Sequence, residues 1–137
     1  MAVHLNSSGS GHAGSLVASG KIKDSGSWSA PSAEAENSYI KEHGMGGYSK
    51  WFMGVDTDED KSTKGHYKFP FSSNFEDADY AGLRACEQRA AQAGYTDIEN
   101  RAKTLFEEAK KKLGKDKKEE KSFRMEKANG KKVWVIE

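Results

Sequence analysis

The sequence predicts a small, mostly helical α+β domain, and three observations point to that class. With 137 residues the chain is long enough for one domain but short for two. Its large apolar and aromatic residues gather in the middle, whereas the first 27 residues hold almost none of them. Two successive stretches after residue 79 have helical spacing, and residues 66–71 alternate polar and aromatic side chains as a strand does. We therefore predict one compact, aromatic-cored domain over residues 28–113.

Residues 1–27 form an N-terminal segment that is rich in Ser and Gly. Within it, residues 12–20 predict a short helix with Gly20 as its C-terminal stop. Leu16 and Val17 are the only sizeable apolar side chains of that helix, so it persists only if it is docked on another element. A flexible arm and a docked helix both agree with this composition, and the sequence leaves the two alternatives open.

A second helix is predicted over residues 32–42. Pro31, Ser32 and the early glutamates suit a helix N-terminus, where negative charge meets the positive end of the helix dipole. Gly44 ends this helix, and further glycines make the loop after it. Residues 48–53 then predict another short helix or helical turn.

A loop and an extended segment come next. Residues 56–65 are strongly charged and predict a surface loop. Residues 66–71 alternate polar and aromatic side chains, which is the period of a strand. Pro70 cannot donate a hydrogen bond to a sheet, so this segment is expected at a sheet edge or in an extended loop.

The clearest prediction is an antiparallel helical hairpin. Its first helix covers residues 80–93, with Asp77 or Asp79 as the N-cap and a glycine at the C-terminal end. Thr96 is expected to cap the second helix, and Glu99 completes a capping box with it. The apolar residues of the second helix follow the spacing of one buried face: Ile98, Ala102, Leu105, Phe106, Ala109 and Leu113.

Beyond residue 113 the sequence predicts a charged linker and then a β-hairpin. Residues 114–121 contain lysines and acids with no apolar side chain. Residues 122–137 hold two short β-like runs around Asn129 and Gly130, and Asn-Gly is the strongest short signal for a hairpin. Because a lone hairpin is only marginally stable in water, these residues are expected to begin a following domain.

The charge pattern gives little support for nucleic-acid or membrane binding. The net charge is +1 at pH 7, which creates no global field toward either partner. The stretch from Lys110 to Lys118 could contact phosphates, but interleaved acids weaken its field and no aromatic residue is there to stack on bases. A solvated helix end is the favoured interpretation, and a nucleic-acid-binding or packaging accessory is the alternative. With one cysteine, no signal peptide and no membrane-spanning run, the chain is expected to be soluble and cytoplasmic.

No cofactor and no metal site is predicted. Asp56, Asp58 and Asp60 have the spacing that opens a calcium loop. A lysine then stands where that loop needs glycine, and a tyrosine stands where it needs glutamate. The four histidines share no ligand spacing with one another or with Cys86. We interpret Cys86 as a buried helix residue, and the opposing hypothesis is a hydrolase fragment that uses it as a nucleophile.

The aromatic residues of the middle region outnumber what so small a core needs, which suggests a docking patch at the surface. The alternative is that all of these rings pack inward around the helical hairpin. We expect no catalytic residue in this chain. The candidate partner-docking residues are Tyr48, Trp51, Phe52, Tyr67, Phe69 and Phe71.

Three stretches carry a family resemblance: YSKWFMGVD at residues 48–56, TKGHYKFPF at residues 63–71 and YAGLRACEQRAAQ at residues 80–92. They resemble an N-terminal domain of tailed-bacteriophage and prophage head proteins. In that domain a Lys-x-x-Tyr-Lys-(Phe/Leu)-Pro-Phe segment precedes an Ala/Arg-rich helix and an Asp-Ile helix, to which Asp97 and Ile98 correspond. The resemblance covers roughly residues 12–113.

Domains of this kind often stand ahead of a prohead (head maturation) protease. The resemblance therefore implies a non-catalytic head-assembly module, the N-terminal targeting or regulatory region of such a protease, which docks on phage capsid or scaffold protein. Residues 123–126 and 130–136 are similar to the opening strands of the protease domain. The catalytic serine and histidine of the family would follow Glu137, so no catalytic position carries over to this chain.

Overall fold

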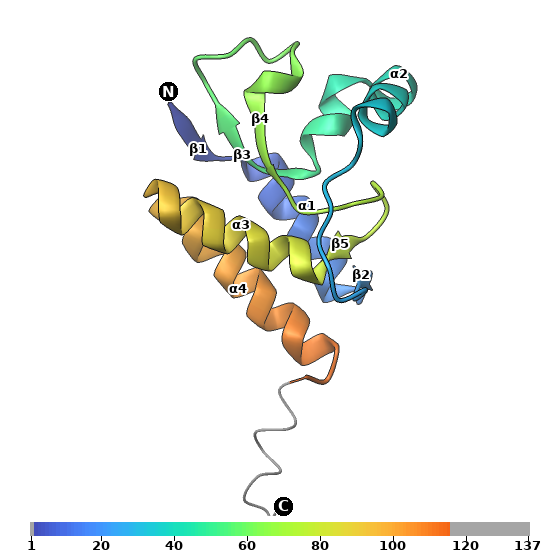
Figure 1. Ribbon diagram of the computed structural model, residues 1–137, viewed down its shortest axis with the longest axis vertical. Coiled ribbons are helices and arrows are strands. Elements are labelled where there is room, and N and C mark those ends of the chain that lie inside the picture. The colour runs from blue at the N-terminus through green and yellow to red at the C-terminus, as the bar shows by residue number, and fades with distance from the viewer. Residues whose placement is uncertain (1, 116–137) are drawn as a thin grey trace, which may run out of the picture.

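The computed structural model describes residues 2–115, in which helices and short strands form the predicted mostly helical α+β class (Figure 1). The predicted C-terminal hairpin and most of the predicted linker lie outside the described residues. In chain order the elements are β1 (Val3–Leu5), α1 (Ser7–Ala18), β2 (Ile22–Lys23), α2 (Ala33–Ser49), β3 (Phe52–Asp56), a 3-10 turn (Lys64–His66), β4 (Tyr67–Pro70), β5 (Ala78–Asp79), α3 (Tyr80–Ala93) and α4 (Thr96–Lys112).

A three-stranded antiparallel sheet has β3 at its centre, between β1 and β4. β4 lies at the edge, as Pro70 predicted. The helical turn predicted over residues 48–53 is wrong in its second half, because the helix ends at Ser49 and Phe52 begins the central strand. The spacing of so short an apolar run does not distinguish a helix from a strand. The segment forms a strand because it pairs with β1 and β4 on its two sides. The register pairs Leu5 with Gly54 on one side of β3, and Gly54 with Lys68 and Phe52 with Pro70 on the other.

The N-terminal segment belongs to the same core, so the domain boundary predicted at residue 28 lies too late in the chain. The short helix expected over residues 12–20 is present as α1, but it begins at Ser7 and ends at Ala18. α1 contacts both β3 and α4, and β1 adds a strand to the sheet. Four apolar side chains of this segment are buried in the core: Val3, Ala13, Leu16 and Val17.

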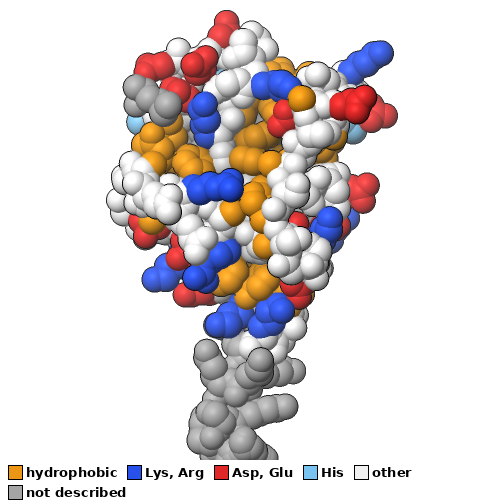
Figure 2. All heavy atoms as spheres, in the orientation of Figure 1, with side chains coloured by type: hydrophobic (Ala, Val, Ile, Leu, Met, Phe, Trp, Pro, Cys, Tyr) orange, Lys and Arg blue, Asp and Glu red, His pale blue; other side chains and the backbone are white. Residues whose placement is uncertain are grey.

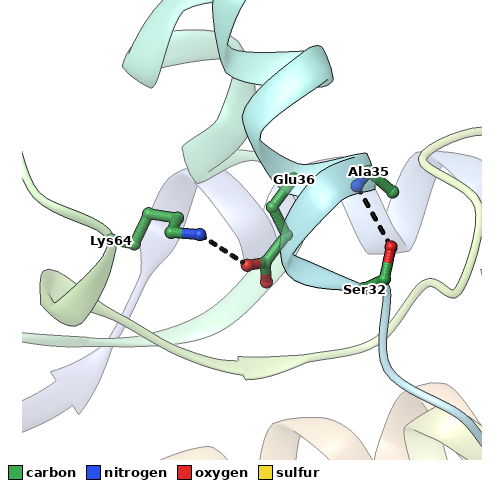
Figure 3. Close-up of polar contacts among 4 residues, drawn as sticks. All are labelled: Ser32, Ala35, Glu36 and Lys64. Carbon is green, nitrogen blue, oxygen red and sulfur yellow. Dashed lines mark hydrogen bonds and ion pairs between the residues drawn. The ribbon is translucent and has the colours of Figure 1, made fainter.

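α2 consists of two helical parts that meet at Gly44, whose φ of 77° interrupts the helix where the sequence predicted its end. The Ser32 side chain caps the first part by accepting a hydrogen bond from the N–H of Ala35 at 3.1 Å (Figure 3). In the first turn, Glu36 forms an ion pair of 3.1 Å with Lys64 (Figure 3). This contact joins α2 to the end of the charged loop that precedes β4.

α3 and α4 form the predicted antiparallel hairpin, and they lie side by side along their length (Figure 1). The carboxylate of Asp79 caps α3 by accepting a hydrogen bond from the N–H of Gly82 at 3.0 Å. Gly94 ends α3 in the left-handed conformation, with φ of 83°. Asp79, one of the two residues predicted as the N-cap of α3, and the glycine predicted at its C-terminal end are thereby confirmed.

The start of α4 differs from the prediction. Tyr95 occupies the cap position and Thr96 is already helical, so the capping box predicted for Thr96 and Glu99 is wrong. The carboxylate of Asp97 accepts a hydrogen bond from the N–H of Leu5 at 3.0 Å. The acidic first turn of α4 therefore holds β1 in place, which is a tertiary contact that local capping rules do not predict.

His12 of α1 has a buried Nε2 atom with no hydrogen-bond partner within residues 2–115. Its ring meets the Trp51 ring edge-to-face, with the centroids 4.5 Å apart. Burial, and to a smaller extent the charge of Lys50, lower the pKa of His12 below the ordinary value of 6.5. His12 therefore takes up a proton less readily in the folded protein than in the unfolded chain.

A base whose pKa is lowered on folding makes the protein less stable as the pH falls below its unfolded pKa, and leaves stability unaffected above it. We expect the free energy of unfolding to fall between pH 6.5 and the lower pKa of folded His12, and this loss to be smaller in His12→Phe. Urea unfolding across roughly pH 5–8 measures it. The control is His4→Gln, because His4 is exposed. Equal pH dependence in all three proteins would contradict the expectation.

Candidate functional site

The six aromatic residues predicted as a docking patch do not form an exposed surface. Tyr67 and Phe69 are half-buried. The other four have exposed fractions of 5% or less: Tyr48, Trp51, Phe52 and Phe71. The alternative interpretation, in which the rings pack inward, therefore describes most of them, and the predicted patch is corrected accordingly.

Ring contacts and polar partners account for this burial. The Tyr48 ring packs on Phe52 with centroids 4.6 Å apart, and burial, with Glu36 nearby, raises the pKa of the Tyr48 hydroxyl. The indole N–H of Trp51 donates to the Tyr39 hydroxyl at 2.9 Å. The polar end of the indole thus keeps a partner while its apolar body fills the core.

A hollow of about 250 Å³ lies where β4, α3 and the turn between α3 and α4 meet, and we call it the β4–α3 hollow. On the face drawn in Figure 2, hydrophobic side chains reach the surface among Lys and Arg side chains. Of the six predicted docking residues, Phe69 lines this hollow. The full lining is Val3, Lys68, Phe69, Pro70, Cys86, Arg89 and Tyr95.

The aromatic wall of the β4–α3 hollow depends on a glycine in the central strand. A Cβ at Gly54 would lie 3.0 Å from the Phe69 ring and 2.9 Å from Ile98 of α4, so glycine lets both side chains lie directly on β3. Phe69 itself has φ of 63°, which is uncommon for a residue other than glycine. Its ring meets Tyr95 edge-to-face, with centroids 5.9 Å apart. Contacts from two sides thus fix the position of Phe69.

Cys86 lies buried on the α3 side of the β4–α3 hollow. Its thiol donates to the carbonyl oxygens of Pro70 at 3.2 Å and Phe69 at 3.4 Å. Burial raises the pKa of the Cys86 thiol to about 12, although the charge of Arg89 opposes this in part. The thiol is therefore protonated at neutral pH and packs as a small apolar side chain, which supports its interpretation as a buried helix residue.

Two cations, Lys68 from β4 and Arg89 from α3, line the β4–α3 hollow. Arg89 is exposed and Lys68 is half-buried. Within residues 2–115 neither of them forms an ion pair or a side-chain hydrogen bond, and no carboxylate is among the lining residues. The hollow is therefore an apolar surface with local positive charge, although the whole chain is nearly neutral.

Two of the three acidic residues considered for calcium, Asp56 and Asp60, accept hydrogen bonds from backbone N–H groups. Asp56 is buried and accepts hydrogen bonds from the N–H groups of Ala2 at 3.3 Å and Asp58 at 3.0 Å. The Asp60 carboxylate accepts from the N–H of Ser62 at 2.8 Å. Among residues 2–115, no group of three or more His, Cys, Asp or Glu side chains is placed to hold a metal ion.

The lysine stretch is described as far as Lys115. The Lys115 ammonium forms an ion pair of 3.0 Å with Asp24 and lies 5.3 Å from the centre of the Tyr80 ring. This lysine is thus engaged with the domain itself. Among the described helices, none is long and apolar enough to cross a membrane.

The size of the β4–α3 hollow limits what it can accept. Small-molecule pockets usually measure roughly 300–1,000 Å³, so this hollow suits one large side chain better than a cofactor. Comparisons with models of protein families, with curated proteins and with solved structures found no match for this chain.

Among the lining residues of the hollow, Phe69 is predicted from the sequence as a docking residue and Cys86 as a buried helix residue, whereas Lys68, Arg89, Tyr95 and Val3 are not. Lys68 is the direct neighbour of Phe69 in the predicted strand, and because neighbouring side chains of a strand point to opposite faces, this adjacency does not predict a shared site. Arg89 lies three residues after Cys86, on the same side of a predicted helix. That helical spacing was an available signal. The approach of Tyr95 and Val3 to that strand depends on the tertiary fold and has no local signal.

Proposed function

We propose that this chain is a non-catalytic head-assembly module of a tailed phage or prophage. It acts as the N-terminal targeting or regulatory region of a head maturation protease, in the host cytoplasm or the virion. Its task is to dock on capsid or scaffold protein and so to place the protease domain that follows. The resemblance over residues 12–113 supports the biological setting.

The observation that carries the docking role is the β4–α3 hollow. It combines an apolar wall with two cations that have no partner in the described domain. Protein interfaces concentrate their binding energy where a large side chain enters such a pocket, and charges at the rim select the partner. Three side chains considered for catalysis or metal binding are engaged within the domain: Cys86, which also lines the hollow, is buried and protonated, and Asp56 and Asp60 cap turns.

A capture experiment tests this function. The 137-residue chain is immobilised and exposed separately to the purified capsid protein and scaffold protein encoded in the same genome. We expect at least one of them to be retained, and its retention to fall as salt is raised, since the hollow is cationic. Retention of neither protein, while the immobilised chain remains folded by circular dichroism, would contradict the proposed function.

A further inference from the structure

The chemistry of the β4–α3 hollow defines its partner more closely. Phe69 and Tyr95 present an apolar wall beside β4, and Pro70 and Cys86 continue it toward α3. A volume of about 250 Å³ has room for one large apolar side chain with some of its backbone. A buried anchor of that kind is typical of peptide recognition.

The two cations add a requirement of charge. Lys68 and Arg89 come from different elements, β4 and α3, and both contribute to the same lining. An uncharged occupant would gain nothing from either cation, and a basic occupant would be repelled. Carboxylates on either side of the apolar anchor would pair with them, and Arg89 can bind a carboxylate through two parallel hydrogen bonds.

The geometry favours a peptide over a nucleic acid. Binding to single strands needs ring faces that are open for stacking and a continuous basic groove. Here the Phe69 and Tyr95 rings meet edge-to-face at 83°, so they pack on each other instead of forming a flat platform. Two isolated cations at an apolar hollow do not make a groove that follows a phosphate backbone.

We infer that the β4–α3 hollow binds a short acidic peptide segment of a partner protein. One large apolar side chain of the segment inserts beside Phe69 and Tyr95, and flanking carboxylates pair with Lys68 and Arg89. This inference rests on the proposed docking function and names the kind of segment by which a capsid or scaffold protein would be recognised.

Titration of the ¹⁵N-labelled full chain with three synthetic peptides tests the inference. The probe is Gly-Glu-Asp-Trp-Asp-Glu-Gly, blocked at both ends. One control replaces its acids with Gln and Asn, and the other replaces Trp with Ala. We expect the probe to shift the amide resonances of the hollow residues. The affinity of each control peptide should be lower by at least about tenfold.

Charge reversal in the protein provides the matched test. In the double variant Lys68→Glu, Arg89→Glu we expect the acidic probe to lose at least about tenfold in affinity. The same variant should gain affinity for a peptide in which lysines replace the acids. Lys103→Glu is the control, because Lys103 is exposed on α4 and does not line the hollow. The unbound spectrum of each variant reports whether the fold is kept.

Several results would overturn the inference. One is that about 1 mM probe shifts no amide resonance of the hollow residues, and another is that the neutral control peptide binds as tightly as the probe. A third is a change in the hollow resonances of the free chain on Trp134→Ala, which would identify the chain's own residues 133–136 as the occupant. A change in these resonances when the free chain is diluted would identify a second copy of the chain as the occupant.

The two proposals fail separately. If the probe binds the hollow but neither capsid nor scaffold protein is retained by the chain, the inference stands and the proposed function fails. If the charge-reversed variant retains capsid or scaffold protein as well as the original chain does, the proposed function stands and the inference fails.

Discussion

Replacing Gly9 with alanine is expected to lower the free energy of unfolding by about 3 kcal/mol or more. Gly9 lies in α1 where the helix crosses β3, and it is buried. A Cβ at this position would overlap the carbonyl oxygen of Phe52, lie 2.7 Å from its carbonyl carbon and lie 3.2 Å from the Asn6 amide. Because backbone of the central strand cannot rotate away as a side chain can, the helix itself must move off the sheet.

Gly11→Ala is the matched control for that prediction. Gly11 lies in the same helix, is exposed, and a Cβ there meets no atom within 4 Å. Alanine should stabilise the helix there by roughly 0.5–1 kcal/mol, so the two substitutions have opposite expected signs. Urea unfolding of both variants measures the difference. A Gly9→Ala protein as stable as Gly11→Ala would show that α1 does not lie this close to β3.

The second large effect is expected from Asn6→Asp. The buried Asn6 amide donates to the carbonyl oxygens of Ser49 and Phe52, each at 2.9 Å, and so joins β1 to the end of α2 and the start of β3. A carboxylate of the same shape donates nothing and faces two carbonyl oxygens. We expect a loss of about 3 kcal/mol or more near neutral pH.

The pH dependence separates this cause from a general packing defect. The carbonyl oxygens and burial should raise the pKa of the introduced carboxyl in the folded state. A raised folded pKa in an acid costs stability as the pH rises, so the deficit should shrink toward about pH 4. Asn37→Asp is the control: Asn37 is exposed on α2, and a change within about 0.5 kcal/mol is expected. A deficit for Asn6→Asp that is independent of pH would contradict this account.

The three elements most easily predicted from sequence were those with local signals. α3 and α4 have regular apolar spacing, and α3 has an acidic N-cap and a terminal glycine, so the helical hairpin was predicted nearly to its ends. β4 alternates polar and aromatic residues, and Pro70 correctly indicated an edge.

The elements that the sequence left open or assigned wrongly depend on contacts between distant segments. α1 docks through a small residue, Gly9, against the backbone of Phe52, so its Ser- and Gly-rich composition left a docked helix and a flexible arm both open. β3 is a strand because β1 and β4 pair with it on both sides. Without the N-terminal strand in view, Phe52 and Met53 were assigned to the end of a helix.

In the candidate site, too, local features were predicted from the sequence and features that depend on the tertiary fold were not. Phe69 was identified as a docking residue because aromatic side chains stood out in the sequence. Whether such a ring is exposed depends on the core, and four of the six rings proved to be buried there. The hollow joins residues as far apart as Val3 and Tyr95, which the sequence alone did not bring together.

We propose the β4–α3 hollow as the surface by which this chain docks on a head protein. The most direct test of this proposal is photo-crosslinking from within the hollow, with p-benzoylphenylalanine placed at Tyr95 in the full chain. Lys103, on the exposed side of α4, serves as the control position. In an assembly mixture of capsid and scaffold proteins, we predict a crosslink to one of them from position 95 and none from position 103. Equal crosslinking from both positions, or crosslinking from position 103 alone, would contradict the claim.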